Sequence, residues 1–173
     1  MKAVFLDRDG VLNDDVGYLH KIEDLHWIDG AREALACLRK SGYTLFVVTN
    51  QSGIARGYYT IEDMKKLHEH MGRVLAAGGG AVEKFYYCPH HRDGSVAEYA
   101  VDCDCRKPKP GMLLQAMNEY DIDTEESFLI GDSSRDVDAA AAAGIKGYLF
   151  TGGNLEEFVK EILEQRQAKS REE

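Results

Sequence analysis

The chain has 173 residues and a formal net charge of −9, with 44% hydrophobic and 29% charged residues. A domain of this size buries roughly 70% of the surface that its unfolded chain exposes, so one hydrophobic core is expected to suffice. The acidic balance argues against broad binding to nucleic acids or anionic membranes. No apolar run approaches the roughly 20 residues of a membrane span or forms a signal-peptide core, so we expect a cytoplasmic protein.

Short apolar runs alternate with longer stretches of helical periodicity, a pattern typical of βα units in a parallel sheet. In chain order, we expect a strand at 3–6 and a helix at 31–39, a strand at 45–48 and a helix at 60–77, a strand at 85–87 and a helix at 112–120, a strand at 128–130 and a helix at 138–143, and a strand at 148–150 and a helix at 155–165. Thr60 and Asp63 have the spacing of a capping box at the start of the longest helix. We expect one α/β domain over residues 1–166, followed by a polar tail, 167–173, that frays.

Polar residues follow the predicted strands in four clusters. Asp7-Arg8-Asp9-Gly10 follows the first strand, and Thr49-Asn50-Gln51-Ser52 follows the second. Arg106-Lys107-Pro108 follows a segment rich in cysteine and histidine, and Gly131-Asp132 with Asp136 follows the strand at 128–130. Ligands of open parallel sheets bind outside the carboxyl ends of the strands, so we expect the four clusters to converge on one rim.

Four aspartates of these clusters would repel one another in a small space, and a divalent cation would resolve the repulsion. They are Asp7, Asp9, Asp132 and Asp136. An all-oxygen site with few protein ligands favours Mg²⁺, whereas a calcium loop fails because Val11 and Tyr18 stand where two further ligands belong. The Thr49 hydroxyl and the Lys107 ammonium would face the oxygens of a phosphoryl group.

A second cluster of potential metal ligands consists of Cys88, His90, Cys103 and Cys105. Three thiolates and one imidazole form a closed tetrahedral set, which predicts a structural Zn²⁺ site in the loop 88–105. His91 is an alternative ligand that the spacing does not exclude, and free thiols or a disulfide would be the alternative without metal. Zinc binding would order the segment 83–109 and thereby fix Lys107.

The four polar clusters resemble the motifs of the haloacid dehalogenase-like phosphatases, in the same order. This resemblance implies a three-layer Rossmann-like sheet with helices on both faces. It also implies that Asp7 accepts the phosphoryl group, that Asp9 acts first as acid and then as base, and that Thr49 and Lys107 hold the phosphoryl oxygens. By the same resemblance, Mg²⁺ binds to Asp7, to the backbone carbonyl of Asp9 and to Asp132, while Asp136 orients these groups.

The zinc loop and the lack of room for a large cap domain narrow the resemblance to two families, the D-glycero-D-manno-heptose-1,7-bisphosphate 7-phosphatases and the histidinol-phosphate phosphatases. The stretches 17–30, 50–57, 86–91 and 103–108 resemble the heptose enzymes, which implies removal of the 7-phosphate from a heptose bisphosphate. Guanidinium groups suit the second phosphate. The implied substrate contacts are Asp15, Val16, Gly17, Tyr18, Thr49, Asn50, Gln51, Ser52, Arg56, Arg106 and Lys107. Ser133 stands where many heptose enzymes have a lysine.

There are two alternatives to this expectation, one of the same class with another substrate and one of a different class. The first is a phosphatase for histidinol phosphate or for another small phosphomonoester. The second is a non-catalytic module that only binds zinc and another cation. For the phosphatase we expect a monomer whose partner is a small phosphorylated sugar, with no nucleic acid and no membrane.

Overall fold

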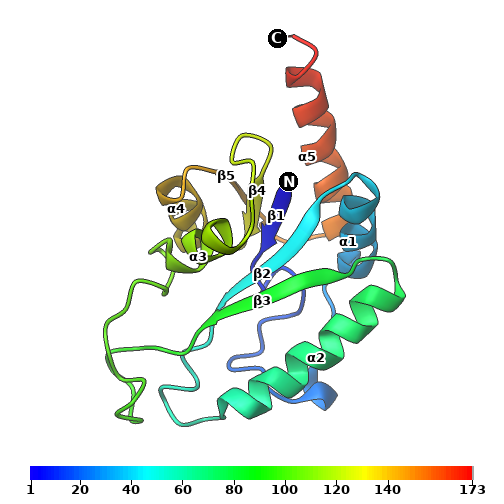
Figure 1. Ribbon diagram of the computed structural model, residues 1–173. Helices are drawn as coiled ribbons and strands as arrows, with labels where there is room; N and C mark the ends of the chain where they lie inside the picture. Colours follow the sequence, from blue (N-terminus) through cyan, green and yellow to red (C-terminus); the bar gives the residue numbers. More distant parts are fainter. Residues whose placement is uncertain (173) are drawn as a thin grey trace.

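Strands and helices alternate along the computed structural model, which describes residues 1–172 (Figure 1). The strands are β1 (Ala3–Leu6), β2 (Thr44–Asn50), β3 (Val82–Cys88), β4 (Phe128–Gly131) and β5 (Lys146–Leu149). The helices are η1 (Ile22–Asp24, a short 3₁₀ turn), α1 (Ala31–Lys40), α2 (Ile61–Ala77), α3 (Gly111–Glu119), α4 (Ser134–Ala142) and α5 (Leu155–Lys169). Each strand and each α-helix expected from the sequence is present; β1 has the expected bounds, and the other elements have shifted ends.

The strands of the described residues form one sheet in the order β3-β2-β1-β4-β5. Every neighbouring pair is parallel, and β1 lies at the centre, where Val4 is paired with Leu45 of β2 and with Phe128 of β4. Because all strands run in the same direction, their carboxyl ends lie along one edge. The loops that follow β1, β2 and β4 therefore meet at that edge.

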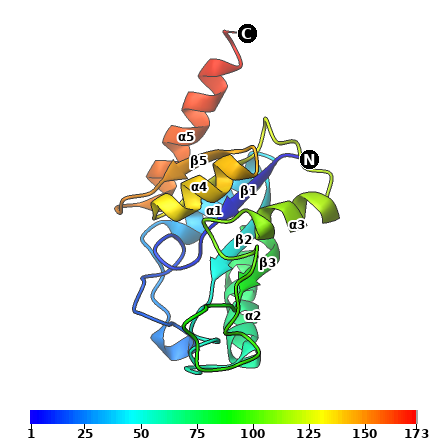
Figure 2. The same cartoon turned by 90° about the vertical axis from the view of Figure 1, so that its left-hand side faces the viewer.

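Helices cover both faces of this sheet, with α3 and α4 on one side and α1, α2 and α5 on the other (Figures 1 and 2). The side chains of β1 alternate between the two cores because successive strand residues point to opposite faces. Val4 and Leu6 pack with α1, α2 and α5, whereas Ala3 and Phe5 pack with α3 and α4. The predicted three-layer α/β fold is confirmed.

Caps and anchors explain where the helices begin and end. Thr60 and Asp63 form the predicted capping box of α2. Helix α4 begins at Ser134 rather than at 138, because Ser133 and Asp136 form a second capping box there. Helix α5 continues to Lys169, into the stretch expected to fray, because Arg166 donates a hydrogen bond to the Glu125 carbonyl at 3.0 Å and stacks on Phe128. Residue 173 of that stretch lies outside the described residues.

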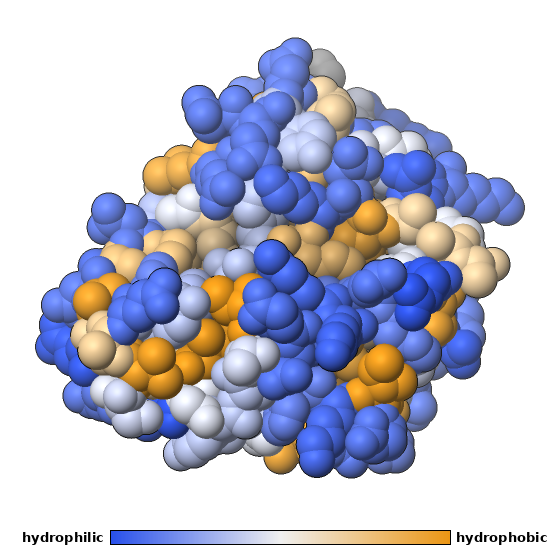
Figure 3. All heavy atoms as spheres, turned by 60° about the horizontal axis from the view of Figure 1, so that its bottom comes forward, coloured by the Kyte–Doolittle hydropathy of each residue, from blue (hydrophilic) through white to orange (hydrophobic). Residues whose placement is uncertain are grey.

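The surface is consistent with the acidic, polar composition. The face in Figure 3 is mainly hydrophilic, and its orange apolar patches are separated by blue residues. No helix within residues 1–172 has both the length and the apolarity to cross a membrane.

Candidate active site

A cleft of about 440 Å³ opens at the carboxyl edge of the sheet. Its wall contains most of the residues predicted for catalysis and substrate binding: Asp7, Asp9, Asp15, Gly17, Tyr18, Asn50, Gln51, Ser52, Arg56, Arg106, Lys107, Asp132 and Asp136. Thr49 lies buried beside the cleft, where its Oγ1 accepts a hydrogen bond from Gln51 Nε2 at 2.8 Å. Val16 is not part of the wall and is 53% exposed. The fold thus brings the four polar clusters together but leaves Val16 outside.

Lys107 lies at the floor of the cleft and joins two of the aspartates. Its Nζ donates to Asp7 Oδ1 at 2.9 Å and to the Val48 carbonyl at 2.8 Å, and it lies 2.6 Å from Asp136 Oδ1. Burial favours the neutral amine, but the two carboxylates outweigh this effect and raise the pKa of Lys107. The lysine is therefore a buried cation.

Asp7, Asp132 and Asp136 each place one carboxylate oxygen within 4.8 Å of the others. Burial raises the pKa of Asp7 well above its usual value, and the charge of Lys107 offsets this only in part. Burial is also the main cause of the raised pKa of Asp132. Carboxylates this close favour a bound cation, and a set of hard oxygen donors fits Mg²⁺.

Asp136 also holds the loop that carries Asp132. Its Oδ2 accepts three hydrogen bonds of 3.1 Å, from the backbone N–H groups of Asp132 and Ser133 and from the Ser133 hydroxyl. One buried carboxylate thus fixes the start of α4 and the position of Lys107 at the same time.

The Asp9 carboxylate is separate from this acidic group and lies in a network of donors. Its Oδ1 accepts from Arg8 Nη2 at 2.9 Å and from Asn13 Nδ2 at 3.0 Å, and its Oδ2 accepts from Gln51 Nε2 at 3.3 Å. The Tyr59 hydroxyl donates in turn to Gln51 Oε1. Tyr59 lines the cleft, although the sequence offered no motif that would single it out.

Arginine side chains supply positive charge to the cleft wall. Arg56 and Arg106 line the cleft as predicted from the sequence. Arg135 also lines it, next to Ser133, but neither was predicted as a cleft residue. Arg56 Nε and Arg106 Nη1 are buried and have no hydrogen-bond partner among residues 1–172. Burial, followed by the nearby charge of Arg135, lowers the pKa of Arg106. Unpaired guanidinium donors in a cleft favour an anionic ligand.

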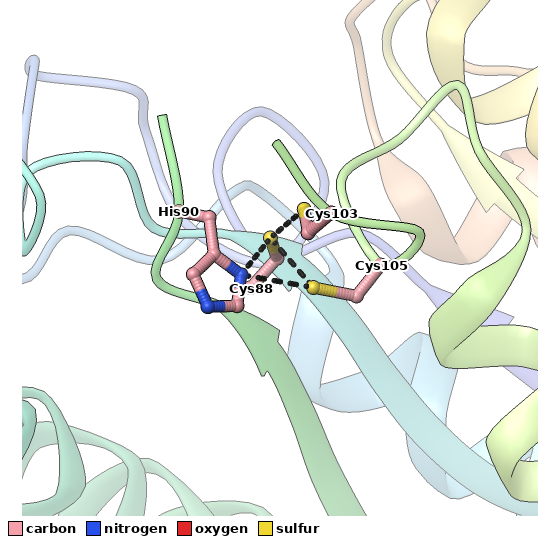
Figure 4. A group of neighbouring side chains, drawn as sticks. All are labelled: Cys88, His90, Cys103 and Cys105. Carbon is pink, nitrogen blue, oxygen red and sulfur yellow. Dashed lines mark hydrogen bonds between the residues drawn. The ribbon is translucent and has the colours of Figure 1, made fainter. Parts of the chain in front are cut away.

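The predicted zinc ligands lie together beside the cleft (Figure 4). Cys88 Sγ lies 2.9 Å from Cys105 Sγ and 3.5 Å from Cys103 Sγ, and His90 Nδ1 lies 3.3 Å from Cys105 Sγ. Ligands about 2.3 Å from a central zinc would stand somewhat under 4 Å apart, so the chemistry of a Cys₃His set fits the metal, and the closest sulfur pair would have to separate by roughly 1 Å. The cysteines are free thiols rather than disulfides within the described chain.

The structure distinguishes the two neighbouring histidines. His90 points into the cysteine group through Nδ1, whereas His91 accepts a hydrogen bond from the Asp93 N–H at 3.1 Å and lies 3.5 Å from Arg56 Nη2. His90, and not His91, is therefore the histidine that lies with the three cysteines in a group that could hold a metal ion. Directly beyond Cys105, the Asn50 side chain bonds both the backbone N–H and the backbone carbonyl of Lys107, at 3.0 and 3.1 Å.

Comparisons with known proteins agree with this geometry. Residues 104–169 match the family model described as HAD-hydrolase-like. A Pasteurella multocida protein named D-glycero-beta-D-manno-heptose-1,7-bisphosphate 7-phosphatase is 54% identical over 145 residues, which are 84% of this chain and 78% of the relative. A Rhodopseudomonas palustris protein of the same name is 43% identical over 165 residues, 95% of this chain and 92% of the relative.

A solved structure supports the same grouping. The D,D-heptose 1,7-bisphosphate phosphatase from B. bronchiseptica, complexed with magnesium and phosphate, superimposes with a TM-score of 0.78 at 37% identity, over 93% of this chain and 87% of that one. The sheet and its acidic cleft thus define a phosphatase of the haloacid dehalogenase-like class. Within that class, the chain belongs to the family of D-glycero-D-manno-heptose-1,7-bisphosphate 7-phosphatases. The family and the hydrolase class expected from the sequence are confirmed.

Proposed function

We propose that the chain hydrolyses the 7-phosphate ester of D-glycero-β-D-manno-heptose 1,7-bisphosphate. The observation that carries this proposal is the presence, in one cleft, of the Asp7–Lys107 pair at the floor and of unpaired guanidinium donors on the wall. Such a cleft can hold a reacting phosphate and a second phosphate of the same molecule. The named activity of the relatives supplies the sugar and its β configuration.

Asp7 is the nucleophile in this proposal. Its carboxylate oxygen attacks the phosphorus, the bond from phosphorus to the sugar oxygen breaks, and Asp9 delivers a proton to that oxygen. A water molecule then attacks the aspartyl phosphate while Asp9 takes a proton from it, so that inorganic phosphate leaves and Asp7 is restored. Splitting the displacement into two steps requires one carboxylate to serve first as acid and then as base.

Thr49 and Lys107 hold the transferred group. The Thr49 hydroxyl already accepts a hydrogen bond from Gln51, so its own hydrogen remains available for a phosphoryl oxygen. The Lys107 ammonium faces the same place from the floor and neutralises charge that develops on the oxygens. Asp136 keeps Lys107 in position through the 2.6 Å ion pair.

Two metals complete the proposed enzyme. Asp7, the Asp9 carbonyl and Asp132 would hold Mg²⁺, which when bound neutralises the phosphate and the clustered carboxylates. Cys88, His90, Cys103 and Cys105 would hold a structural Zn²⁺ with no open position. The support for both sites is the chemistry of the donor sets that the fold assembles.

Arg56 and Arg106 bind the phosphate that is not hydrolysed. The sugar hydroxyls lie against the loops 15–18 and 50–52, with Asp15, Tyr18 and Ser52 in the wall and Val16 contributing at most its backbone. We further propose a cytoplasmic monomer without nucleic-acid or membrane partners. The net charge of −9 supports the absence of polyanionic partners.

Side-by-side kcat/KM values test this proposal. We expect the β anomer of the heptose bisphosphate to exceed the α anomer and histidinol phosphate by about tenfold or more, a difference of about 1.4 kcal/mol in transition-state binding. Preferred turnover of histidinol phosphate would refute the substrate assignment. Asp7→Asn should keep the native circular-dichroism spectrum and lose turnover of all these substrates, and full activity in this variant would refute the nucleophile.

A further inference from the structure

Arg8 stands between the two aspartates of the first polar cluster, yet its side chain turns away from the cleft into the protein. It is fully buried and is the largest of the fully buried side chains. A buried cation costs several kcal/mol unless hydrogen bonds and an opposite charge compensate it. The contacts that compensate Arg8 therefore indicate why the fold keeps it.

The guanidinium of Arg8 is held from two sides. Nη2 donates to Asp9 Oδ1 at 2.9 Å and Oδ2 at 3.2 Å and to the Leu19 carbonyl at 2.9 Å. On the other side, Nη1 lies 3.0 Å from Nε2 of His68, a residue of α2. The Asp9 carboxylate is thus connected through Arg8 to a helix that begins more than 50 residues further along the chain.

His68 is itself fixed within the protein and accepts from Arg8. Its ring is 6% exposed and stacks on Phe85 of β3 with 4.6 Å between the ring centroids. Burial lowers the pKa of His68 to about 3, so the ring is neutral at ordinary pH and Nε2 offers a lone pair to the Arg8 N–H. His68 does not belong to the wall of the cleft.

We propose that His68 and Arg8 are positioning residues that fix the orientation of the Asp9 carboxylate for proton transfer to the leaving oxygen. His68 sets the plane of the guanidinium, and the guanidinium, together with Asn13 and Gln51, holds the carboxylate. A general acid must lie within hydrogen-bond reach of the oxygen it protonates, so a small rotation of Asp9 would slow this step. The inference rests on the proposed role of Asp9.

The leaving group distinguishes positioning from a purely structural role. The kcat/KM value covers only the steps up to departure of the leaving group, and p-nitrophenolate leaves without a proton whereas a sugar alkoxide needs one. In His68→Leu we therefore expect kcat/KM for the heptose bisphosphate to fall about tenfold or more, and that for p-nitrophenyl phosphate to change less than about threefold. His68→Gln, which keeps an acceptor, should recover most of the loss, and His70→Leu on the same helix should behave as the unaltered chain.

Equal losses on both substrates, or no loss on either, would overturn the positioning role. Asp9→Asn, measured in parallel, separates the positioning role of His68 from the acid role of Asp9. It should lose more kcat/KM on the bisphosphate than on p-nitrophenyl phosphate even if His68→Leu does not. Equal losses on the two substrates in Asp9→Asn would refute the acid role of Asp9 itself. If His68→Leu fails to fold, Arg8→Lys takes its place, because it keeps the charge and loses the fork that holds both oxygens of Asp9. The same ratio of losses then decides.

Discussion

Replacing Asp136 with asparagine tests whether one buried carboxylate joins α4 to Lys107. Asp136 is 1% exposed, and its two oxygens face different donors. Oδ2 accepts from Asp132 N–H, Ser133 N–H and the Ser133 hydroxyl, and Oδ1 lies 2.6 Å from the Lys107 ammonium. An asparagine amide has one accepting group, the carbonyl oxygen, and one donating group, NH₂. In either orientation, the NH₂ group must therefore face the donors of the loop or the Lys107 ammonium.

The size of the effect follows from these contacts. If the amide carbonyl faces the loop, the contact with the Lys107 ammonium is lost. A hydrogen bond to a charged group contributes about 1.5–3 kcal/mol to stability, and a buried donor that faces another donor costs about 1–3 kcal/mol more. Lys107 retains Asp7 and the Val48 carbonyl, which limits the penalty. We therefore expect Asp136→Asn to lower the free energy of unfolding by about 3 kcal/mol, or the melting temperature by roughly 6–12 °C for a chain of this length.

Urea denaturation followed by circular dichroism measures this change. Asp138→Asn is the matched control, because Asp138 lies on the same helix and is exposed. The control should change the free energy of unfolding by less than about 0.5 kcal/mol. A loss below about 1 kcal/mol in Asp136→Asn, with the control unchanged, would show that the loop and the ammonium do not depend on the same carboxylate.

Further predictions concern the metal loop, the second phosphate and pH. Freshly purified protein should contain about one zinc per chain by elemental analysis. Cys103→Ser should lose the metal, and proteases should cleave its loop 88–105 faster than that of the unaltered chain. Arg56→Gln should raise KM for the bisphosphate about tenfold but leave KM for a monophosphate within about twofold, because only the former brings a second phosphate to Arg56. The pKa of His68 is lowered from 6.5 to about 3 in the folded chain, so on acidification the unfolded chain binds this proton first, which favours unfolding. In urea titrations, the stability advantage of the unaltered chain over His68→Gln should therefore shrink as the pH falls from 6.5 toward 3.

The residues that could be predicted from the sequence are those whose signal is local. Asp7, Thr49 and Asp132 follow apolar runs that form β1, β2 and β4, and parallel topology then requires their side chains to share an edge. The grouping of Cys103 and Cys105 with Cys88 could be predicted for the same reason, since their spacing alone suggests a metal site. The choice of His90 over His91 required the path of the loop after β3.

The residues that were missed depend on contacts that no sequence motif encodes. His68 is one of the buried residues of α2, but nothing in its own neighbourhood identifies Arg8, 60 residues earlier, as its partner. Tyr59 reaches Gln51 because Gly53 lacks a side chain: a Cβ there would lie 2.2 Å from Tyr59 Cε1. The extension of α5 likewise depends on a contact of Arg166 with the loop before β4. A pattern of hydrophobicity carries no information about such pairs.

The distribution of charge bears on how an acidic chain would accommodate the doubly phosphorylated ligand proposed above. The cations beneath the cleft are already compensated, Arg8 by Asp9 and Lys107 by Asp7 and Asp136. The donors without partners in the described chain lie instead on the wall, at Arg56 and Arg106. Because the cations at the floor are already paired, we expect the reacting phosphate to bind there only with the help of the proposed Mg²⁺. The unpaired donors on the wall would attract a second phosphate by charge. Under the proposed function, the loop 88–105 would serve both phosphates, because Arg106 and Lys107 directly follow Cys105.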